Sequence, residues 1–264
     1  MKAYFSAFRM RWKMELQYRG AVLGGILCQI FFGLVLVAVY RALYLGNPQA
    51  GMRLSDITTY VWLQQAFFRM LLSSDPELMD KIRTGGIAYE LCRPVQLYGF
   101  YYARITAQKL MGSLLRAAPM LLFAALLPEG WGISLPASLP ALLLAACGVM
   151  LGLLCVSAME CISMGFTMRT LDFRGVYALM NLLMTTFAGN ILPLTLFPDS
   201  WQRAITLLPY AQMLDTPIRL YTGAYALSQA PAALLIQAVW IALLVSLGLA
   251  LWARNQKKLI VQGG

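Results

Sequence analysis

The sequence predicts an all-α integral membrane protein with six transmembrane helices, and three observations support this fold class. Of the 264 residues, 60% are hydrophobic, and the mean hydropathy is +0.66. Only 12% are charged, about half the share of a soluble domain, so the chain could not cover a water-facing surface. Four apolar runs also contain no charged residue and are long enough to cross a bilayer. They are 20–40, 135–159, 176–197 and 230–253.

Two further apolar runs each contain one basic residue. The run 57–72 holds Arg69 near its end, and the run 110–127 holds Arg116. Both lie between stronger runs at suitable spacing, so we expect the chain to form a single transmembrane domain, 1–264. Its six predicted spans are 20–40, 55–72, 103–127, 135–160, 175–197 and 230–253.

The distribution of Lys and Arg predicts the orientation. With the N-terminus inside, the inner segments hold fifteen of these residues and the outer segments hold four, namely Arg41, Arg53, Arg203 and Arg219. Basic residues concentrate in cytoplasmic loops. We therefore predict a protein of the cell (inner) membrane whose two termini are both cytoplasmic. The same bias explains the net charge of +10 without a nucleic-acid partner.

Composition also argues against an enzyme. The chain has no histidine, which excludes His-based triads and HExxH zinc sites. Its eleven carboxylates form no close cluster inside a span, and its five cysteines show no CxxC pair or metal-ligand spacing. We expect no catalytic residue, no bound metal and no cofactor in this chain.

The first nineteen residues predict a helix that lies in the inner membrane interface. Phe5, Phe8, Trp12 and Leu16 form one stripe on a helical wheel, with basic residues along its flank. The alternative is a short helix continuous with the first span.

The segment between the second and third spans carries strong helix signals. Asp75 can cap a helix that begins at Pro76, and the charges in its first and last turns suit the helix dipole. Two glycines end it, and a second short turn follows at 87–91. We predict a compact helix at about 76–84, lying below the membrane and pressing on a soluble partner. The alternative is a purely structural loop.

Two short apolar helices are expected at about 199–223, outside the membrane or re-entering it. They are too short to cross and are tolerated at membrane depth only when packed on protein. Pro193 and Pro198 are expected to break the end of the fifth span. Asp199 or Ser200 can cap a first short helix at 201–208, which Pro209 ends. Asp215 or Thr216 can cap a second, which begins at Pro217 and ends before Gly223.

This order of parts resembles the ABC-2 type export permeases. Two stretches carry the resemblance. IRTGGIAYELCRPV, residues 82–95, is similar to the I-x-x-G-x-x-x-x-x-L-x-R-P-V pattern of one six-helix branch. FAGNILPLTLFPDSWQRAITLLPY, residues 187–210, resembles the family's G-x-x-x-P-x-x-x-x-P followed by a helix and L-P.

The resemblance implies a transmembrane permease subunit that exports substrate by alternating access. The helix at 76–84 would be the coupling helix that docks on an ABC ATPase subunit, and a second permease, identical or a sister chain, would complete a dimer. The ATPase must be a separate chain that binds ATP and Mg²⁺, because none of the six lysines follows a glycine as a P-loop requires. The expected ATPase-coupling residues are Glu77, Asp80, Lys81, Arg83, Glu90 and Arg93.

Polar residues inside the predicted spans are candidates for the translocation route. They are Arg116, Asn181, Thr185, Thr186 and Asn190. Interhelical hydrogen bonding is the alternative role for those of the fifth span. Glu160 is a possible partner of Arg116, although its expected depth argues against direct contact. The expected outer gate consists of Pro193, Pro198, Trp201 and Pro209.

A competing function is an ATP-independent channel or secondary transporter. It would favour intramembrane ion ligands or an internal repeat, and no repeat is evident in the sequence. Gly20-xxx-Gly24 and Gly148-xxx-Gly152 each allow close helix approach.

Overall fold

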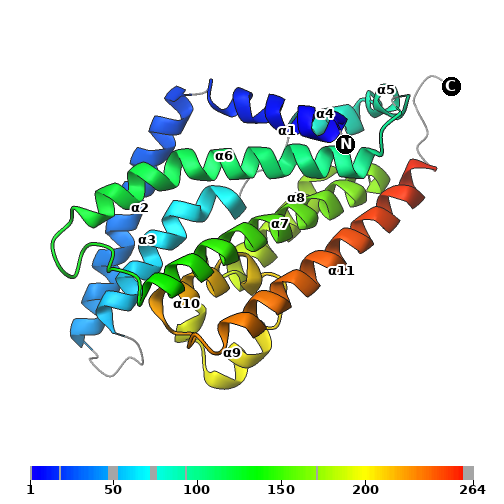
Figure 1. Ribbon diagram of the computed structural model, residues 1–264. Helices are drawn as coiled ribbons and strands as arrows, with labels where there is room; N and C mark the ends of the chain where they lie inside the picture. Colours follow the sequence, from blue (N-terminus) through cyan, green and yellow to red (C-terminus); the bar gives the residue numbers. More distant parts are fainter. Residues whose placement is uncertain are drawn as a thin grey trace.

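The computed structural model describes residues 2–17, 19–46, 53–71, 76–92, 94–170 and 172–257. These residues form α-helices and two short 3₁₀ turns, with no strand among them (Figure 1). The elements are α1 (Lys2–Glu15), α2 (Arg19–Gly46), α3 (Leu54–Leu71), α4 (Pro76–Arg83), α5 (Ile87–Leu91), α6 (Leu97–Ala125), α7 (Leu139–Thr170), α8 (Phe173–Phe187), η1 (Leu194–Leu196), α9 (Asp199–Ile205), η2 (Ala211–Met213), α10 (Asp215–Thr222) and α11 (Ala230–Gln256).

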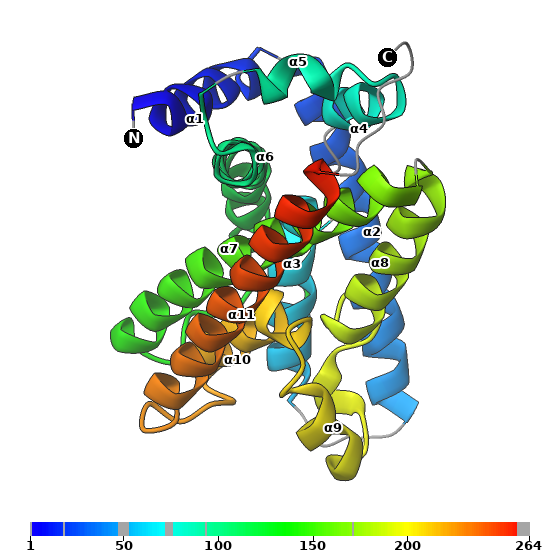
Figure 2. The same ribbon diagram turned by 90° about the vertical axis from the view of Figure 1, so that its right-hand side faces the viewer.

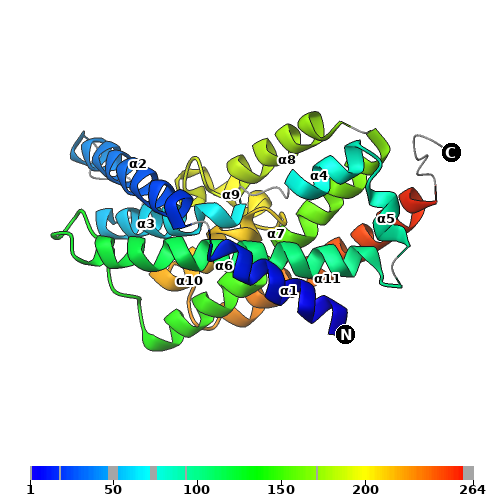
Figure 3. The same ribbon diagram turned by 90° about the horizontal axis from the view of Figure 1, so that it is seen from above.

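The long helices form one bundle with two distinct ends. The start of α1 and the end of α11 lie near one end together with α4 and α5, and we call this the terminal end (Figure 1). The short helix α9 lies at the opposite, far end, which Figure 2 shows clearly. Seen from above, α1 lies over α6 (Figure 3), and the two helices pack against each other.

Three helices are long and apolar enough to cross a membrane, considering the described residues. They comprise Gly20–Tyr44, Leu139–Thr170 and Ala230–Gln256, so the chain is a membrane protein. The other three predicted spans also contain helices, namely α3, α6 and α8. However, α8 has only 15 residues and extends about 22 Å, less than the roughly 30 Å of a hydrocarbon core. The count of six spans therefore remains a prediction.

Three helices differ in extent from the predicted spans. The third predicted span, 103–127, begins earlier, because α6 already starts at Leu97 after an extended Gln96. The fourth, 135–160, starts at Leu139 and continues to Thr170, because Glu160 finds a counter-charge inside the bundle and does not end the helix. The fifth, 175–197, is helical only to Phe187. A left-handed glycine follows at 189 (φ 79°) and turns the chain.

The expected caps of the two short far-end helices are also wrong. Pro198 occupies the N-cap position of α9, which spans Asp199–Ile205 and not 201–208. The N-cap of α10 is Leu214, without a side-chain cap bond. Asp215 is instead the first residue of α10 and binds other side chains. The predicted stop of α10 is confirmed, because Gly223 adopts the left-handed conformation (φ 78°).

The helix predicted for the first nineteen residues is present as α1. Its rings of Phe8 and Trp12 stack with centroids 5.9 Å apart, while Phe5 is 70% exposed. A break after Glu15 separates α1 from α2, so the two are not one continuous helix. The placement of α1 in a membrane interface remains a prediction.

Helices α7 and α11 pack together over most of their length. Three side chains of α11 donate hydrogen bonds to backbone carbonyls of α7. They are Gln237 to Gly148 (3.1 Å), Trp252 to Cys161 (2.6 Å) and Asn255 to Gly165 (2.6 Å). These bonds fix the register of the pair, because each donor reaches one specific carbonyl.

The Gly20/Gly24 and Gly148/Gly152 pairs, which have the same spacing, differ in how closely other parts of the chain approach them. A Cβ on Gly152 would lie 2.6 Å from the carbonyl oxygen of Met213, and one on Gly148 would lie 3.4 Å from Pro217. Gly20 and Gly24 have nothing within 4 Å of such an atom. Only the second pair therefore permits a close helix contact, between α7 and the η2–α10 segment.

We predict that Gly152→Ala destabilises the protein by about 1–3 kcal/mol, because the added methyl meets backbone that cannot move aside. The control Gly24→Ala should be neutral or stabilise by up to about 1 kcal/mol, since alanine favours an exposed helix position. Thermal unfolding of both variants in detergent measures the difference. Equal stability of the two variants would contradict the close contact.

Candidate functional site

The segment α4–α5 is fixed to the terminal end of the bundle by an apolar face. Leu78, Met79 and Ile82 of α4 and Ile87 of α5 are all buried. They belong to a cluster that includes Tyr101 of α6 and residues of α7 and α11. The predicted helix at 76–84 is confirmed as α4, which spans Pro76–Arg83, and the predicted turn at 87–91 is confirmed as α5.

A chain of charged side chains joins α4 to α5 and α6. Glu77 pairs with Arg104 of α6 and with Lys81, whose Nζ lies 2.9 Å from Glu77 Oε1. The same Nζ lies 2.9 Å from Oε1 of Glu90 on α5. The hydrogen bond from Arg104 to Glu77 lowers the pKa of this carboxyl to about 2. Three of the predicted coupling residues, Glu77, Lys81 and Glu90, thus hold α4 and α5 in place within this chain.

Other side chains of this segment face outward. Asp80 is exposed, and Tyr89 of α5 is 82% exposed. Arg83 is the last residue of α4, and Arg93 lies outside the described residues. The segment therefore presents an acidic residue and an aromatic ring on a helix pair that is fixed from behind.

A second charged group lies in the middle of the bundle. Lys109 of α6 is fully buried, and its Nζ lies 2.6 Å from Oε2 of Glu160 on α7. The same Nζ donates a hydrogen bond to the carbonyl of Met70 on α3 at 3.1 Å. One buried amine therefore links three helices. The sequence suggested Glu160 as a possible partner of Arg116, and the structure pairs it with Lys109.

A third polar group ties the far-end segments to α3. The hydroxyl of Tyr60 donates to Asp215 Oδ1 at 2.9 Å, and Arg219 Nε donates to Asp215 Oδ2 at 2.5 Å. One turn along α3, Gln64 donates to the backbone carbonyl of Asn190. The turn after α8 and the start of α10 are thereby both anchored on one helix.

The predicted route residues do not come together in this chain. Arg116 lies against α2, since its guanidinium occupies the space that a Cβ on Gly25 would need, at 2.7–2.9 Å. Asn181 of α8 instead lines a small cavity of about 20 Å³ together with Glu160. The hydroxyl of Thr185 donates to the carbonyl of Asn181 at 2.7 Å. Thr186 is half-buried on the same helix.

The predicted gate residues divide into two pairs. Pro193 and Pro209 are buried, and the carbonyl of Pro209 accepts a hydrogen bond from Cys155 Sγ on α7. Pro198 and Trp201 are exposed, with 62% of Trp201 accessible. The buried prolines shape the turns around α9, and the exposed residues form part of its free surface.

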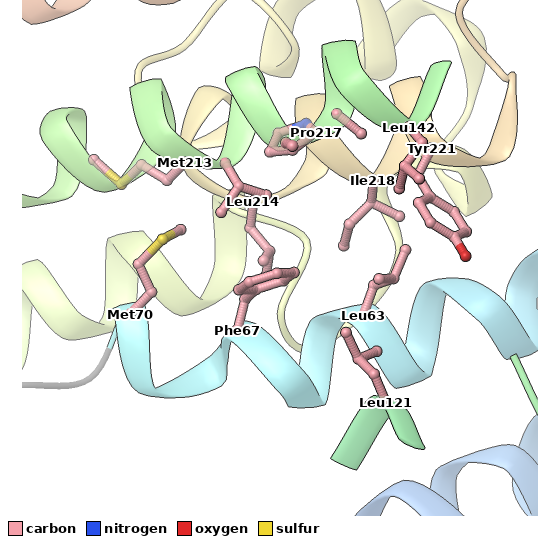
Figure 4. A pocket seen from close by; sticks show the side chains of 13 residues that line it. Leu63, Phe67, Met70, Leu121, Leu142, Met213, Leu214, Pro217, Ile218 and Tyr221 are labelled. Carbon is pink, nitrogen blue, oxygen red and sulfur yellow. The ribbon is translucent and has the colours of Figure 1, made fainter. Parts of the chain in front are cut away.

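An apolar cavity of about 140 Å³ lies between α3, α7 and α10. Figure 4 shows Leu63, Phe67 and Met70 of α3 facing Met213, Leu214 and Ile218. Tyr221 contributes its ring, while its hydroxyl donates to the carbonyl of Ser134 at 3.0 Å. This cavity can bury an apolar group and offers almost no polar surface.

Comparison with known proteins places the chain in a family. The sequence model described as ABC-2 family transporter protein matches residues 26–263, which is most of the chain and every element except α1 and the start of α2. The chain belongs to the ABC-2 transporter family. No curated protein and no solved structure gave a match.

The resemblance drawn from the two sequence stretches is confirmed by this match. The protein is an ABC-2 type permease, the membrane subunit of an ABC transporter, and its family works with an ABC ATPase subunit. Within the described residues, no group of three or more potential metal ligands is present, and all five cysteines are free.

Sequence reasoning did not predict the Lys109–Glu160 and Asp215–Arg219 pairs of this ABC-2 protein. Lys109 and Arg219 were counted among the basic residues of the inner and outer segments, and both lie inside helices, α6 and α10. The four-residue spacing of Asp215 and Arg219 is a local signal for a helical ion pair. Lys109 and Glu160 are 51 positions apart, and no local pattern indicates that pair.

We predict that Lys109→Met destabilises the ABC-2 protein by about 3–5 kcal/mol, because it removes the counter-charge of Glu160 inside the bundle. The double variant Lys109→Met/Glu160→Gln should recover most of this loss, since both charges are then absent. The exposed Lys257→Met serves as the control, with no expected change. Thermal unfolding in detergent measures all three, and a double variant no more stable than Lys109→Met would refute the pairing.

The lowered pKa of Glu77 predicts a pH-dependent contribution to stability. Because its folded pKa is about 2 and its ordinary value is 4.5, ionised Glu77 stabilises the fold fully above pH 4.5. This contribution is lost as the pH falls from 4.5 towards 2. The melting temperature of the wild type should therefore exceed that of Glu77→Gln at pH 7, and the difference should shrink at pH 3. A difference independent of pH would count against the Arg104 pairing.

Proposed function

We propose that this ABC-2 permease exports a substrate by alternating access, as one of a pair of permeases driven by ATP hydrolysis in a separate ATPase subunit. The observation that carries the proposal is the construction of the α4–α5 segment. It is buried on one face against α6, α7 and α11 and tied to α6 by the Glu77–Arg104 ion pair. A force applied to its outer surface would therefore be passed directly to long helices of the bundle.

In this proposal α4 is the coupling helix, and its predicted contacts have two roles. Glu77, Lys81 and Glu90 hold the segment in shape through their mutual ion pairs. Asp80, Arg83 and Arg93 would contact the ATPase. The exposed Tyr89 adds a ring to that surface, and aromatic residues frequently anchor protein interfaces.

The transport route in this proposal lies between two permease subunits. Helix α8 supports this placement, because Met184 is its only buried side chain among the described residues. Its half-buried Asn181, Thr185 and Thr186 would then face the route, with Asn190 at its end. The segment around α9, with Pro193, Pro198, Trp201 and Pro209, would form the outer gate.

The proposed orientation places the terminal end of the bundle in the cytoplasm, with both chain termini and α4. Removing Arg104, Lys109 and Arg219 from the loop count leaves an excess of basic residues on the same side, so the charge bias still supports this orientation.

Purification in mild detergent tests the proposal, since a subunit with a P-loop should accompany the tagged permease. The complex reconstituted into vesicles should then move substrate only when ATP is supplied. Transport by the isolated chain without ATP would refute the proposal and favour a channel or secondary transporter.

We predict that Asp80→Ala/Tyr89→Ala reduces the amount of ATPase that co-purifies by at least about tenfold, because an aromatic anchor and a charge are lost from the interface. The isolated permease should still fold, since both side chains are exposed. Leu135→Ala, at a 92% exposed position before α7, is the control. Undiminished ATPase in the double variant would show that the partner docks elsewhere.

A further inference from the structure

A cavity of about 230 Å³ lies at the far end, between the segment from α9 to α10 and the start of α11. It is larger than the apolar cavity between α3, α7 and α10, and none of its lining residues belongs to the proposed route or gate. A cavity of about 150 Å³ accommodates benzene. The cavity at the far end therefore has room for a six-membered ring that carries substituents.

One wall of this cavity is polar and buried. It includes Gln212, which is 2% exposed, and Thr216, which is 1% exposed. Gln212 Nε2 donates to the carbonyl of Thr206 at 2.5 Å, and Thr216 Oγ1 donates to Gln212 Oε1 at 3.0 Å. Gln237 of α11 fixes the wall from behind, since its Nε2 donates to the backbone carbonyl of Gln212 at 2.7 Å. These bonds hold the polar wall in a defined shape before any ligand binds.

The lining keeps hydrogen-bonding capacity that the described residues do not use. An amide nitrogen has two N–H groups, and Gln212 donates one of them to a described residue. The hydroxyl of half-buried Tyr225 and the amide nitrogen of Gln229 donate to none of the residues that the structure describes. These donors, together with the acceptor oxygen of Thr216, suit a ligand group that both donates and accepts. A hydroxyl group has this property.

The charges around the cavity favour an uncharged ligand. Among the described residues that line it, none carries a charge. The guanidinium of Arg219 lies 5.5 Å from the centroid of the Tyr225 ring, but Arg219 Nε pairs with Asp215 Oδ2 at 2.5 Å. This neighbouring pair has no net charge. A charged group in the cavity would lose its hydration without gaining a counter-charge from the lining.

The wall that α11 contributes is apolar and crosses a membrane boundary. The apolar span of α11 begins at Ala230, so Gln229 lies just outside it. Ile236, which also lines the cavity, is six residues further, about 9 Å along the helix. Its neighbours Leu235 and Val239 are 65% and 49% exposed. An apolar chain attached to a group in the cavity could therefore continue along exposed apolar surface of the same helix.

We propose that this cavity binds the uncharged, hydroxyl-bearing head group of an amphipathic molecule, whose apolar chain lies along α11. The polar wall supplies partners for the hydroxyl groups, and the volume suits a single sugar-sized ring. The position at the start of the α11 span places the head group at the membrane surface and the chain within the membrane. This binding needs neither the ATPase nor transport, so the inference stands apart from the proposed function.

The test is thermal unfolding of the purified full-length protein in an amine-oxide detergent, whose head group has no hydroxyl. Octyl glucoside should raise the melting temperature in a saturable way. Octyl sulfate, with the same chain and an anionic head, should not, and neither should methyl glucoside, which lacks the chain. An equal rise with octyl sulfate would overturn the uncharged head group, and an equal rise with methyl glucoside would overturn the amphipathic ligand. No rise with octyl glucoside would refute the site itself.

Variants locate the effect in the cavity. Ala233 lines it from α11, and Ala233→Leu should weaken the apparent affinity for octyl glucoside at least about tenfold by filling the space. Ala238→Leu, at an exposed position of the same helix outside the cavity, is the matched control and should leave the affinity unchanged. An unaltered titration of Ala233→Leu would overturn the proposal.

A second variant removes a polar partner without adding volume. Thr216→Val should weaken the apparent affinity about fivefold, the loss expected for one hydrogen bond. An unchanged affinity would remove Thr216 from the site. Should either variant fail to fold, the comparison of the three additives on the wild-type protein still decides.

Discussion

Lys109 joins three helices of the bundle at one point. Its fully buried amine contacts the Glu160 carboxylate of α7 and the Met70 carbonyl of α3. Charge in a low-dielectric interior is tolerated only with a close counter-charge and further hydrogen bonds. The relative positions of α3, α6 and α7 are therefore constrained more tightly than apolar packing alone would achieve, because apolar side chains tolerate small shifts that an ion pair does not.

The same constraint recurs towards both ends of the molecule. At the far end, Asp215 receives hydrogen bonds from Tyr60 and Arg219, which sets α10 against α3. At the terminal end, Arg104 holds Glu77 and so places α4. Arg104 and Lys109 both belong to α6. This helix thus carries the cationic partners for two of the three groups, and it connects the α4–α5 segment with the middle of the bundle.

The sequence indicates local structure well and long-range pairing poorly. Proline, glycine and the charges in the terminal turns predicted α4 and α5 and the end of α10, because those signals act within a few residues. Helix α7 continues to Thr170, beyond Glu160, which was the predicted inner end of the fourth span. Glu160 lies within the bundle because Lys109 supplies its counter-charge. The predicted cap at Asp215 failed for the same reason, since Tyr60 and Arg219 compete for that carboxylate. The Lys109–Glu160 pair depends on a tertiary contact that no local pattern records.

Helix α7 has a consequence for any motion of this protein. It is one unbroken helix of 32 residues, about 48 Å long, and it touches α4 at the terminal end and η2 and α10 towards the far end. A continuous helix of this length is stiff, so a force applied at one of its ends is not taken up by bending in the middle. A tilt imposed beside α4 must move the whole length of α7. Near the middle of this helix, Gly152 lies against the carbonyl of Met213, so the same motion would be passed on to η2.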